Sequence, residues 1–255
     1  MANASVVRIA MWSGPRNLST AMMRSFGNRA DTVAVDEPFY AAYLAATGID
    51  HPMRDEILAS QPTDPEAVVS SLLADLPGEA TVHYQKHMTH HMVPAIPRGW
   101  MDGVRNAFLI RSPERVLASY AAKRSTVTLD DLGFAQQAEL HDLVCEVTGE
   151  RPPVIDTDDL LANPEGLLRP LCAALGLAFD PAMLSWPAGR WPCDGVWAAH
   201  WYGAVETSKG FGPASPRPEI TDPAHLAIVE AARPAYDALA AHRLRPAPVA
   251  ADTPA

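Results

Sequence analysis

The sequence has only three cysteines among its 255 residues, and they form neither a disulfide framework nor a metal-binding pattern. Cys145, Cys172 and Cys193 are far apart and include no CxxC pair, so we expect reduced thiols, as in a cytosolic protein. Positive charge is also scarce. The sequence has 20 Lys and Arg residues against 30 Asp and Glu residues, which gives a formal net charge of −10. This balance argues against nucleic acid and against anionic membranes as partners.

Long apolar runs are missing as well. No stretch approaches the roughly 18 apolar residues of a membrane-spanning helix, and no apolar run follows a basic start, so we expect neither a span nor a signal peptide. We therefore predict a cytoplasmic protein. The 48% hydrophobic content is enough for one sizeable core. Since no linker or repeat divides the chain, we predict one domain over residues 1–244 and a disordered Pro/Ala-rich tail over 245–255.

Short apolar runs alternate with helical patterns along the chain. This alternation predicts a three-layer α/β/α fold with a mostly parallel central sheet, of the P-loop nucleotide-binding type. The strands are expected at residues 6–12, 32–35, 81–86, 106–110 and 154–155. The helices are expected at residues 21–26, 64–76, 113–120, 130–148, 163–175 and 223–240, with a loop-broken helical insert at 39–60 and irregular structure at 181–222. Polar clusters follow several strands, and they should meet at one edge of the sheet.

The first of these clusters is the loop over residues 13–20. It combines Gly and Pro for a turn with one guanidinium, Arg16, and with the hydroxyls of Ser19 and Thr20 at the start of a helix. A helix N-terminus offers free N–H groups and about half a positive charge, so this loop is expected to bind a phosphate of a nucleotide. The GxxxxGK[ST] pattern is absent, which argues against ordinary ATP cleavage.

The second cluster is formed by Arg111, at the end of the fourth predicted strand, and Ser119, in the helix that Pro113 opens. Both side chains can reach a single phosphate, and charge-assisted hydrogen bonds of this kind contribute roughly 1.5–3 kcal/mol each. Beside a phosphate-binding loop, the pair provides a place for a second phosphate.

At these two clusters the sequence resembles the sulfotransferases that use 3′-phosphoadenosine 5′-phosphosulfate (PAPS). The resemblance spans roughly residues 6–212 and includes the later strand, acidic loop and Asn-Pro-Glu helix at 154–176. It implies that the first loop holds the 5′-phosphosulfate and that Arg111 and Ser119 hold the 3′ phosphate. It also implies that Lys209 and Gly210 belong to a loop that closes over the nucleotide. The first-loop residues concerned are Arg16, Asn17, Leu18, Ser19 and Thr20. Leu18 stands where the family usually has Gly, and Ser208 stands where some members have Arg before Lys-Gly.

Transfer of a sulfuryl group needs a base that takes up the proton of the hydroxyl or amine that receives it. This base is expected near the third strand, where Lys86 precedes three histidines within five residues. His87 is the first choice for this base, by resemblance to the family's Lys-Thr-His segment, and His90 and His91 compete with it. Glu37, at the end of the second strand, is the second type of candidate. Lys86 could stabilise the leaving oxygen. A metal site formed by the three histidines is the weaker reading, because no fourth ligand is evident.

These observations predict an enzyme that moves a sulfuryl group from PAPS, without a metal, to a hydroxyl or amine of a small molecule. The alternatives are a nucleotide-dependent kinase with Asp36 or Asp156 on Mg²⁺, and a non-catalytic relative that binds the nucleotide. The sequence allows a homodimer. The cluster of Trp186, Trp191, Trp197 and Trp201 is read either as a satellite core or as part of a lid over the acceptor.

Overall fold

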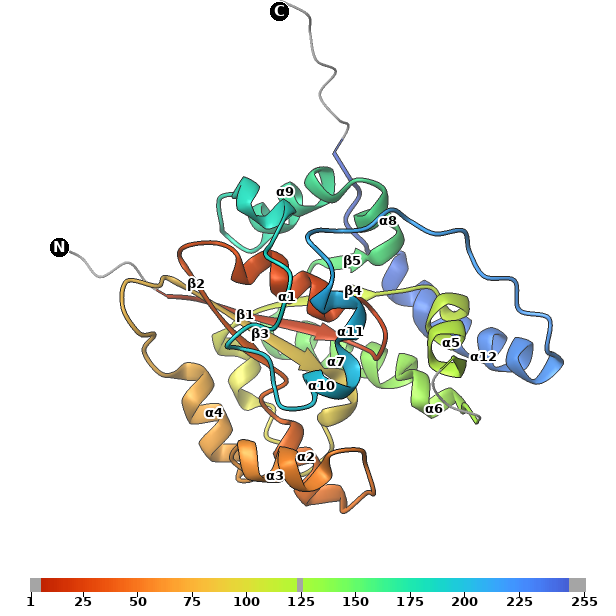
Figure 1. Ribbon diagram of the computed structural model, residues 1–255, viewed down its shortest axis with the longest axis horizontal. Coiled ribbons are helices and arrows are strands. Elements are labelled where there is room, and N and C mark those ends of the chain that lie inside the picture. The colour runs from red at the N-terminus through yellow and green to blue at the C-terminus, as the bar shows by residue number, and fades with distance from the viewer. Residues whose placement is uncertain (1–5, 123–125, 248–255) are drawn as a thin grey trace, which may run out of the picture.

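The computed structural model describes residues 6–122 and 126–247, and it shows a parallel sheet with helices on both faces (Figure 1). The sheet has five strands in the order β2-β3-β1-β4-β5, and all neighbours are parallel. The strands are β1 (Val7–Ser13), β2 (Thr32–Asp36), β3 (Val82–Met88), β4 (Arg105–Ile110) and β5 (Val154–Asp156). This confirms the predicted α/β fold. The largest change is in β3, which runs two residues further than expected and takes in position 87.

The helices follow the predicted pattern, with added short turns. They are α1 (Ser19–Gly27), α2 (Tyr40–Thr47), α3 (Arg54–Ser60), α4 (Pro65–Leu73), α5 (Pro113–Ala121), α6 (Leu129–Leu132), α7 (Phe134–Thr148), α8 (Thr157–Ala162), α9 (Pro164–Ala174), α10 (Ala198–Trp201), α11 (Gly203–Glu206) and α12 (Pro223–Ala240). Three 3₁₀ turns are η1 (Thr89–His91), η2 (Gly99–Gly103) and η3 (Pro181–Leu184). Asp64 and Asn163 cap α4 and α9 as expected. The helix predicted over 130–148 is divided at Gly133, whose φ of 71° ends α6.

The two faces of the sheet bury two separate cores. On one face, Ile9 and Met11 of β1 pack with α1 and α9; on the other, Ala10 and Trp12 pack with η2 and α7. Side chains alternate between the faces of a strand, so the register of β3 decides which of its polar groups reach which side. Tyr84 lies in the first core, and Lys86, two residues on, shares its face.

The segment after α9 folds back along α1 and covers the end of the sheet. It is fixed by an ion pair between Arg24 of α1 and Asp194, with 2.7 Å from nitrogen to oxygen and both side chains buried. The Arg24 guanidinium also lies over the Trp191 ring. Trp197 packs with α2 and α3 in a third core, so it belongs to a satellite core. Trp201 packs against the same core and also lines the cavity described below.

The start of the expected tail is docked on the domain. Ala247 donates its N–H to the carbonyl of Gly166 over 2.8 Å and accepts a hydrogen bond from the Asn163 amide. Ala247 therefore satisfies polar groups at the start of α9, whereas the disorder of the tail as a whole stays a prediction. Residues 1–5 and 248–255 lie outside the described residues, and the single-domain boundary stays a prediction. Within the described ranges no helix is long and apolar enough to cross a membrane.

Candidate active site

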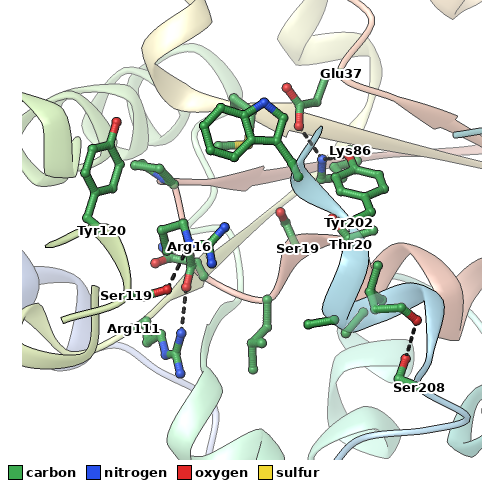
Figure 2. A pocket seen from close by; sticks show the side chains of 18 of the residues that line it. Arg16, Ser19, Thr20, Glu37, Lys86, Arg111, Ser119, Tyr120, Tyr202 and Ser208 are labelled. Carbon is green, nitrogen blue, oxygen red and sulfur yellow. Dashed lines mark hydrogen bonds and ion pairs between the residues drawn. The ribbon is translucent and has the colours of Figure 1, made fainter. Parts of the chain in front are cut away.

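A cavity opens at the carboxyl ends of the central strands, with about 330 Å³ of space for water-sized molecules (Figure 2). It brings together side chains from the four polar clusters that the sequence places at the ends of the first four strands. Its polar lining includes Arg16, Asn17, Ser19, Thr20, Glu37, Lys86, His90, His91, Arg111, Ser119 and Ser208. The convergence expected of a parallel sheet is therefore present.

The backbone of the first loop is shaped to receive an anion. Arg16 and Leu18 both have left-handed φ values, 64° and 59°, on either side of Asn17. Backbone that alternates in hand turns successive N–H groups toward one point, and here the loop runs directly into the N-terminus of α1. Leu18 therefore follows the left-handed path that Gly takes most easily, although it has a side chain.

The strain at Leu18 can be measured with two variants. Leu18→Gly and Leu18→Ala remove the same packing and differ by one methyl group, which clashes with the backbone when φ is positive. We expect the Gly variant to unfold with a free energy about 1 kcal/mol higher than the Ala variant in urea denaturation. An Ala variant as stable as the Gly variant would mean that this position is not strained.

The side chains of Arg16 and Arg111 meet at one end of the cavity. The Arg16 Nε donates to the Ser119 hydroxyl over 2.8 Å, and the Arg111 Nη1 donates to the Arg16 carbonyl over 2.8 Å. The Arg111 Nε is buried without a partner among the described residues. Burial lowers the pKa of both guanidiniums, and Arg115 adds to the effect at Arg111. Two partly buried cations with an unused donor form a site suited to a phosphate.

Asn17 has a different position from its neighbours in the loop. Its amide nitrogen donates to the Leu109 carbonyl of β4 over 3.1 Å, and its side chain is buried. This contact ties the loop to the sheet. The hydroxyl residues Ser19 and Thr20 line the cavity at the start of α1, between the arginine end and Lys86 (Figure 2).

Lys86 is buried and bound to three oxygen atoms. Its ammonium lies 2.8 Å from Asp36 Oδ1, 2.5 Å from Glu37 Oε1 and 2.8 Å from the Tyr202 hydroxyl. Burial alone would lower its pKa, but the two carboxylates outweigh it and the pKa lies well above the ordinary value. Because an ammonium has three donors, a hydrogen bond from Lys86 to a leaving oxygen requires it to give up one of these partners.

Glu37 is held at the cavity wall by its backbone as well as by Lys86. Its φ of 43° is unusual for a residue with a side chain. Hydrogen bonds fix this conformation, because its N–H donates to the Lys86 carbonyl and its carbonyl accepts from the Tyr40 N–H and the Gln61 amide. Burial raises the pKa of the Glu37 carboxyl, although Lys86 acts in the opposite direction. Strained backbone of this kind is concentrated at functional sites.

His87 does not reach the cavity, which corrects the first choice for the base. It lies within β3 and points to the opposite face, where its ring stacks on Trp12 at 4.5 Å and its Nε2 lies 3.2 Å from Gln85 Oε1. Burial lowers its pKa to about 3. His90 and His91, in the turn after β3, do line the cavity, and burial lowers the pKa of His90 to about 4.

The same geometry argues against a metal site formed by the three histidines, because His87 lies on the other face of the sheet from His90 and His91. Throughout the described part of the chain, no group of three or more His, Cys, Asp or Glu side chains is placed to hold a metal ion. Asp36 is also engaged, since it accepts hydrogen bonds from Lys86, Tyr202 and the Gly195 N–H. Its place in this network does not support the Mg²⁺ role that the kinase alternative gives it.

The loop at residues 208–212 meets the expectation only in part. Gly210 lines the cavity together with Ser208, but Lys209 is exposed and is not among the residues that line it. The Lys209 carbonyl accepts the Trp186 N–H, and Ser208 accepts the indole N–H of Trp186. Contacts of Lys209 with a bound nucleotide stay a prediction.

Sequence reasoning missed the part that aromatic residues play in the wall. Tyr40 and Tyr202 both line the cavity, and Tyr202 binds Lys86 and Asp36 across 116 and 166 sequence positions. The adjacent carboxylates of Asp36 and Glu37 at a strand end were the only signal for this network. Nothing in the local sequence marks Tyr202 as their partner.

Comparisons with known proteins identify the family of the chain. A match to the sulfotransferase domain family covers residues 7–243. Two curated Arabidopsis thaliana proteins, branched-chain-amino-acid aminotransferase-like proteins 1 and 2, are 38% and 36% identical over 234 residues, 92% of this chain. The chain spans only 42% and 41% of their lengths.

Solved structures show the same fold at low identity. The sulfotransferase domain of the Synechococcus PCC 7002 olefin synthase has a TM-score of 0.53 at 15% identity, over 91% of this chain and 96% of that one. A sulfotransferase from Alicyclobacillus acidocaldarius has a TM-score of 0.53 at 14% identity, over 94% and 98%. These structures share the fold, and the match over residues 7–243 shows that the chain belongs to the sulfotransferase domain family.

Proposed function

We propose that the chain transfers the sulfuryl group of PAPS to a hydroxyl or amine of a small-molecule acceptor. The observation that carries the proposal is the junction of Arg16, Arg111 and Ser119 beside an anion-binding loop in one cavity. A nucleotide with phosphate groups at both the 5′ and the 3′ position of its ribose needs two such sites, and the loop and the arginine junction support this reading.

In this proposal the first loop and the start of α1 hold the 5′-phosphosulfate through backbone N–H groups and the hydroxyls of Ser19 and Thr20. Arg111 and Ser119 hold the 3′ phosphate, and Arg16 lies close enough to share it, since its Nε is bonded to Ser119. The unused donor of Arg111 fits this role. A sulfuryl group carries less charge than a phosphoryl group, so positioning and hydrogen bonds supply the catalysis and no metal is required.

The acceptor is expected to enter through a second cavity of about 540 Å³ that adjoins the first. The two share His51, His90 and Tyr120 in their walls. Small-molecule sites commonly measure about 300–1,000 Å³, so the volume suits a small acceptor. The proposal involves neither nucleic acid nor a membrane, and it places the reaction in the cytoplasm.

Ligand binding tests the proposal directly. Adenosine 3′,5′-bisphosphate should raise the melting temperature of the protein, and ATP with Mg²⁺ should not, because the loop has no lysine for a γ-phosphate. The opposite result would favour the kinase alternative. If neither ligand stabilises the protein, the proposed donor is wrong.

Arg111→Ala should reduce affinity for the bisphosphate about 10- to 150-fold, because it removes charge-assisted hydrogen bonds to the 3′ phosphate. Titration calorimetry measures this loss. Adenosine 5′-phosphosulfate lacks that phosphate, so its affinity should be unchanged and shows that the loop is intact. Arg169→Ala, an exposed site on α9, is the matched control. Equal losses for both nucleotides would contradict the assignment of Arg111.

A further inference from the structure

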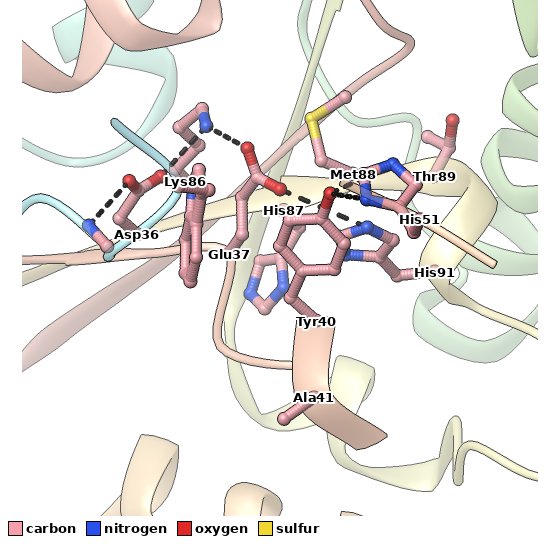
Figure 3. Close-up of polar contacts among 12 residues, drawn as sticks. Asp36, Glu37, Tyr40, Ala41, His51, Lys86, His87, Met88, Thr89 and His91 are labelled. Carbon is pink, nitrogen blue, oxygen red and sulfur yellow. Dashed lines mark hydrogen bonds and ion pairs between the residues drawn. The ribbon is translucent and has the colours of Figure 1, made fainter. Parts of the chain in front are cut away.

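A stack of three rings separates the two cavities. The centre of the His91 ring lies 4.5 Å from that of Tyr40, which lines the first cavity, and 4.8 Å from that of Tyr43, which lines the second. Figure 3 shows Tyr40 and His91 side by side on this partition. A ligand that reaches from one cavity into the other therefore passes aromatic rings. Three further side chains border both cavities: His51, His90 and Tyr120.

On the side of the first cavity, one buried nitrogen of this stack lacks a hydrogen-bond partner. It is the Nε2 of His91, a residue that is 2% exposed, and it bonds to no other described residue. The charged atom nearest to it is Glu37 Oε2, at 3.9 Å, which is too long for a hydrogen bond. A buried polar atom without a partner indicates where a polar group of a ligand binds. The reacting group of the acceptor is therefore expected at this end.

The second cavity has the opposite charge from the arginine end of the first. Its described lining contains four carboxylates and one guanidinium, from Asp50, Asp130, Asp131, Glu139 and Arg98. The guanidinium is already engaged, since its Nη1 lies 3.4 Å from Glu139 Oε1 and its Nη2 donates to the Met92 carbonyl over 2.8 Å. The cavity therefore attracts a positively charged ligand and repels the phosphates of the nucleotide.

The rings beside these carboxylates favour the same charge. Tyr43 and Tyr120 line the second cavity, and a cation within about 6 Å of the centre of a tyrosine ring is attracted to its face. His90 adds no repulsion, because burial lowers its pKa to about 4 and its ring is uncharged at neutral pH. Aromatic rings and carboxylates together are suited to an ammonium group.

We propose that the acceptor is a cation with two separate ends, as in an amino alcohol or a diamine. Its ammonium group lies in the second cavity, and its uncharged hydroxyl or amine lies in the first, beside the His91 Nε2. The inference rests on the proposed function. The two ends must be different groups, because a protonated amine has no lone pair with which to attack sulfur. The partition between the cavities gives each end its own place.

Matched acceptors test the charge. Short-chain amino alcohols are compared with diols and hydroxy acids of the same length, at saturating PAPS, and labelled sulfated product is measured. The best amino alcohol should exceed its diol at least about tenfold in kcat/KM, because several carboxylates and a ring each attract the ammonium group. The hydroxy acid should be the poorest of the three. The preference should decrease as salt is raised, since charges at exposed positions are screened.

A double variant tests the cavity. Asp50→Asn combined with Asp130→Asn should reduce the preference for the amino alcohol over the diol to less than about threefold. Both positions are exposed, so the changes are compatible with the fold. Glu146→Gln is the matched control, because Glu146 is an exposed acid of α7 that does not line the cavity. It should keep the preference of the wild type.

Binding of the bisphosphate separates this inference from the proposed function. A protein that binds the bisphosphate but sulfates no amino alcohol better than its diol overturns the inference and leaves the donor in place. Equal loss of preference in the double variant and in Glu146→Gln also overturns it, since the attraction would then come from the overall charge of −10. A protein that does not bind the bisphosphate contradicts the proposed function itself.

Discussion

Lys86→Met should lower the free energy of unfolding by about 3–5 kcal/mol at pH 7, because it leaves Asp36 and Glu37 buried without their cation. Methionine fills a similar volume, so the loss reports on charge rather than on a cavity. A domain has about 5–15 kcal/mol of stability in total, so this single change should move the urea midpoint strongly.

The pH dependence of this variant gives a second check. Burial raises the pKa of Glu37 in the folded protein, so the folded state takes up a proton that the unfolded state does not hold. The penalty in Lys86→Met should therefore be complete above the raised pKa and should shrink as the pH falls through it toward about 4.5. Adding Glu37→Gln should restore part of the loss at pH 7. A loss below about 1 kcal/mol would show that the cluster does not depend on Lys86.

His87→Phe should make the protein less sensitive to acid. Burial lowers the pKa of His87 to about 3, so below pH 6.5 the unfolded chain binds a proton that the folded protein does not bind. Stability from this group is fully present above pH 6.5 and is lost as the pH falls toward 3, at about 1.4 kcal/mol per pH unit. Between pH 6.5 and 4.5, the wild type should therefore lose about 3 kcal/mol more than the variant.

At pH 7 the substitution lowers the free energy of unfolding for a different reason. Phenylalanine fits among Trp12, Phe39 and Trp100, but the Gln85 Oε1 loses a partner, so a loss of about 1–3 kcal/mol is expected there. His90, His91 and Glu37 titrate in both proteins and cancel in the comparison. His200→Gln, at an exposed position, is the control. Parallel pH curves for wild type and His87→Phe would show that protonation of His87 does not drive the acid loss.

The fold could be predicted from the sequence because each strand and helix is marked by a local sequence pattern. Apolar runs such as 106–110 and caps such as Asp64 and Asn163 predict strands and helix starts within one or two residues. The Arg111 and Ser119 pair was accessible for the same reason, since a strand end and one helix fix its spacing. The division of the 130–148 helix was missed because Gly133 looks like a tolerated helix residue.

The residues proposed to contact the acceptor were harder to predict from the sequence, because their positions depend on the register and length of one strand. Two more residues in β3 place His87 on the far face and move the lining histidines into the following turn. The sequence predicted Lys86 as a site residue. It could not predict that the Lys86 ammonium binds two carboxylates and the Tyr202 hydroxyl. That arrangement depends on how the segment after α9 folds back over the sheet, and no local pattern encodes it.

The hydrogen bonds of Asp36 with Tyr202 and Gly195 have a consequence for the order of folding. They join positions 166 and 159 residues apart, so the unfolded chain must close very long loops to form them. Local helices and neighbouring strands can form earlier, because their contacts are closer in sequence. A chain that has built its sheet but not docked residues 195–202 therefore has an open cavity wall, and its Asp36 side chain lacks the Tyr202 and Gly195 partners and keeps Lys86. Nucleotide binding would thus report completion of the last folding step.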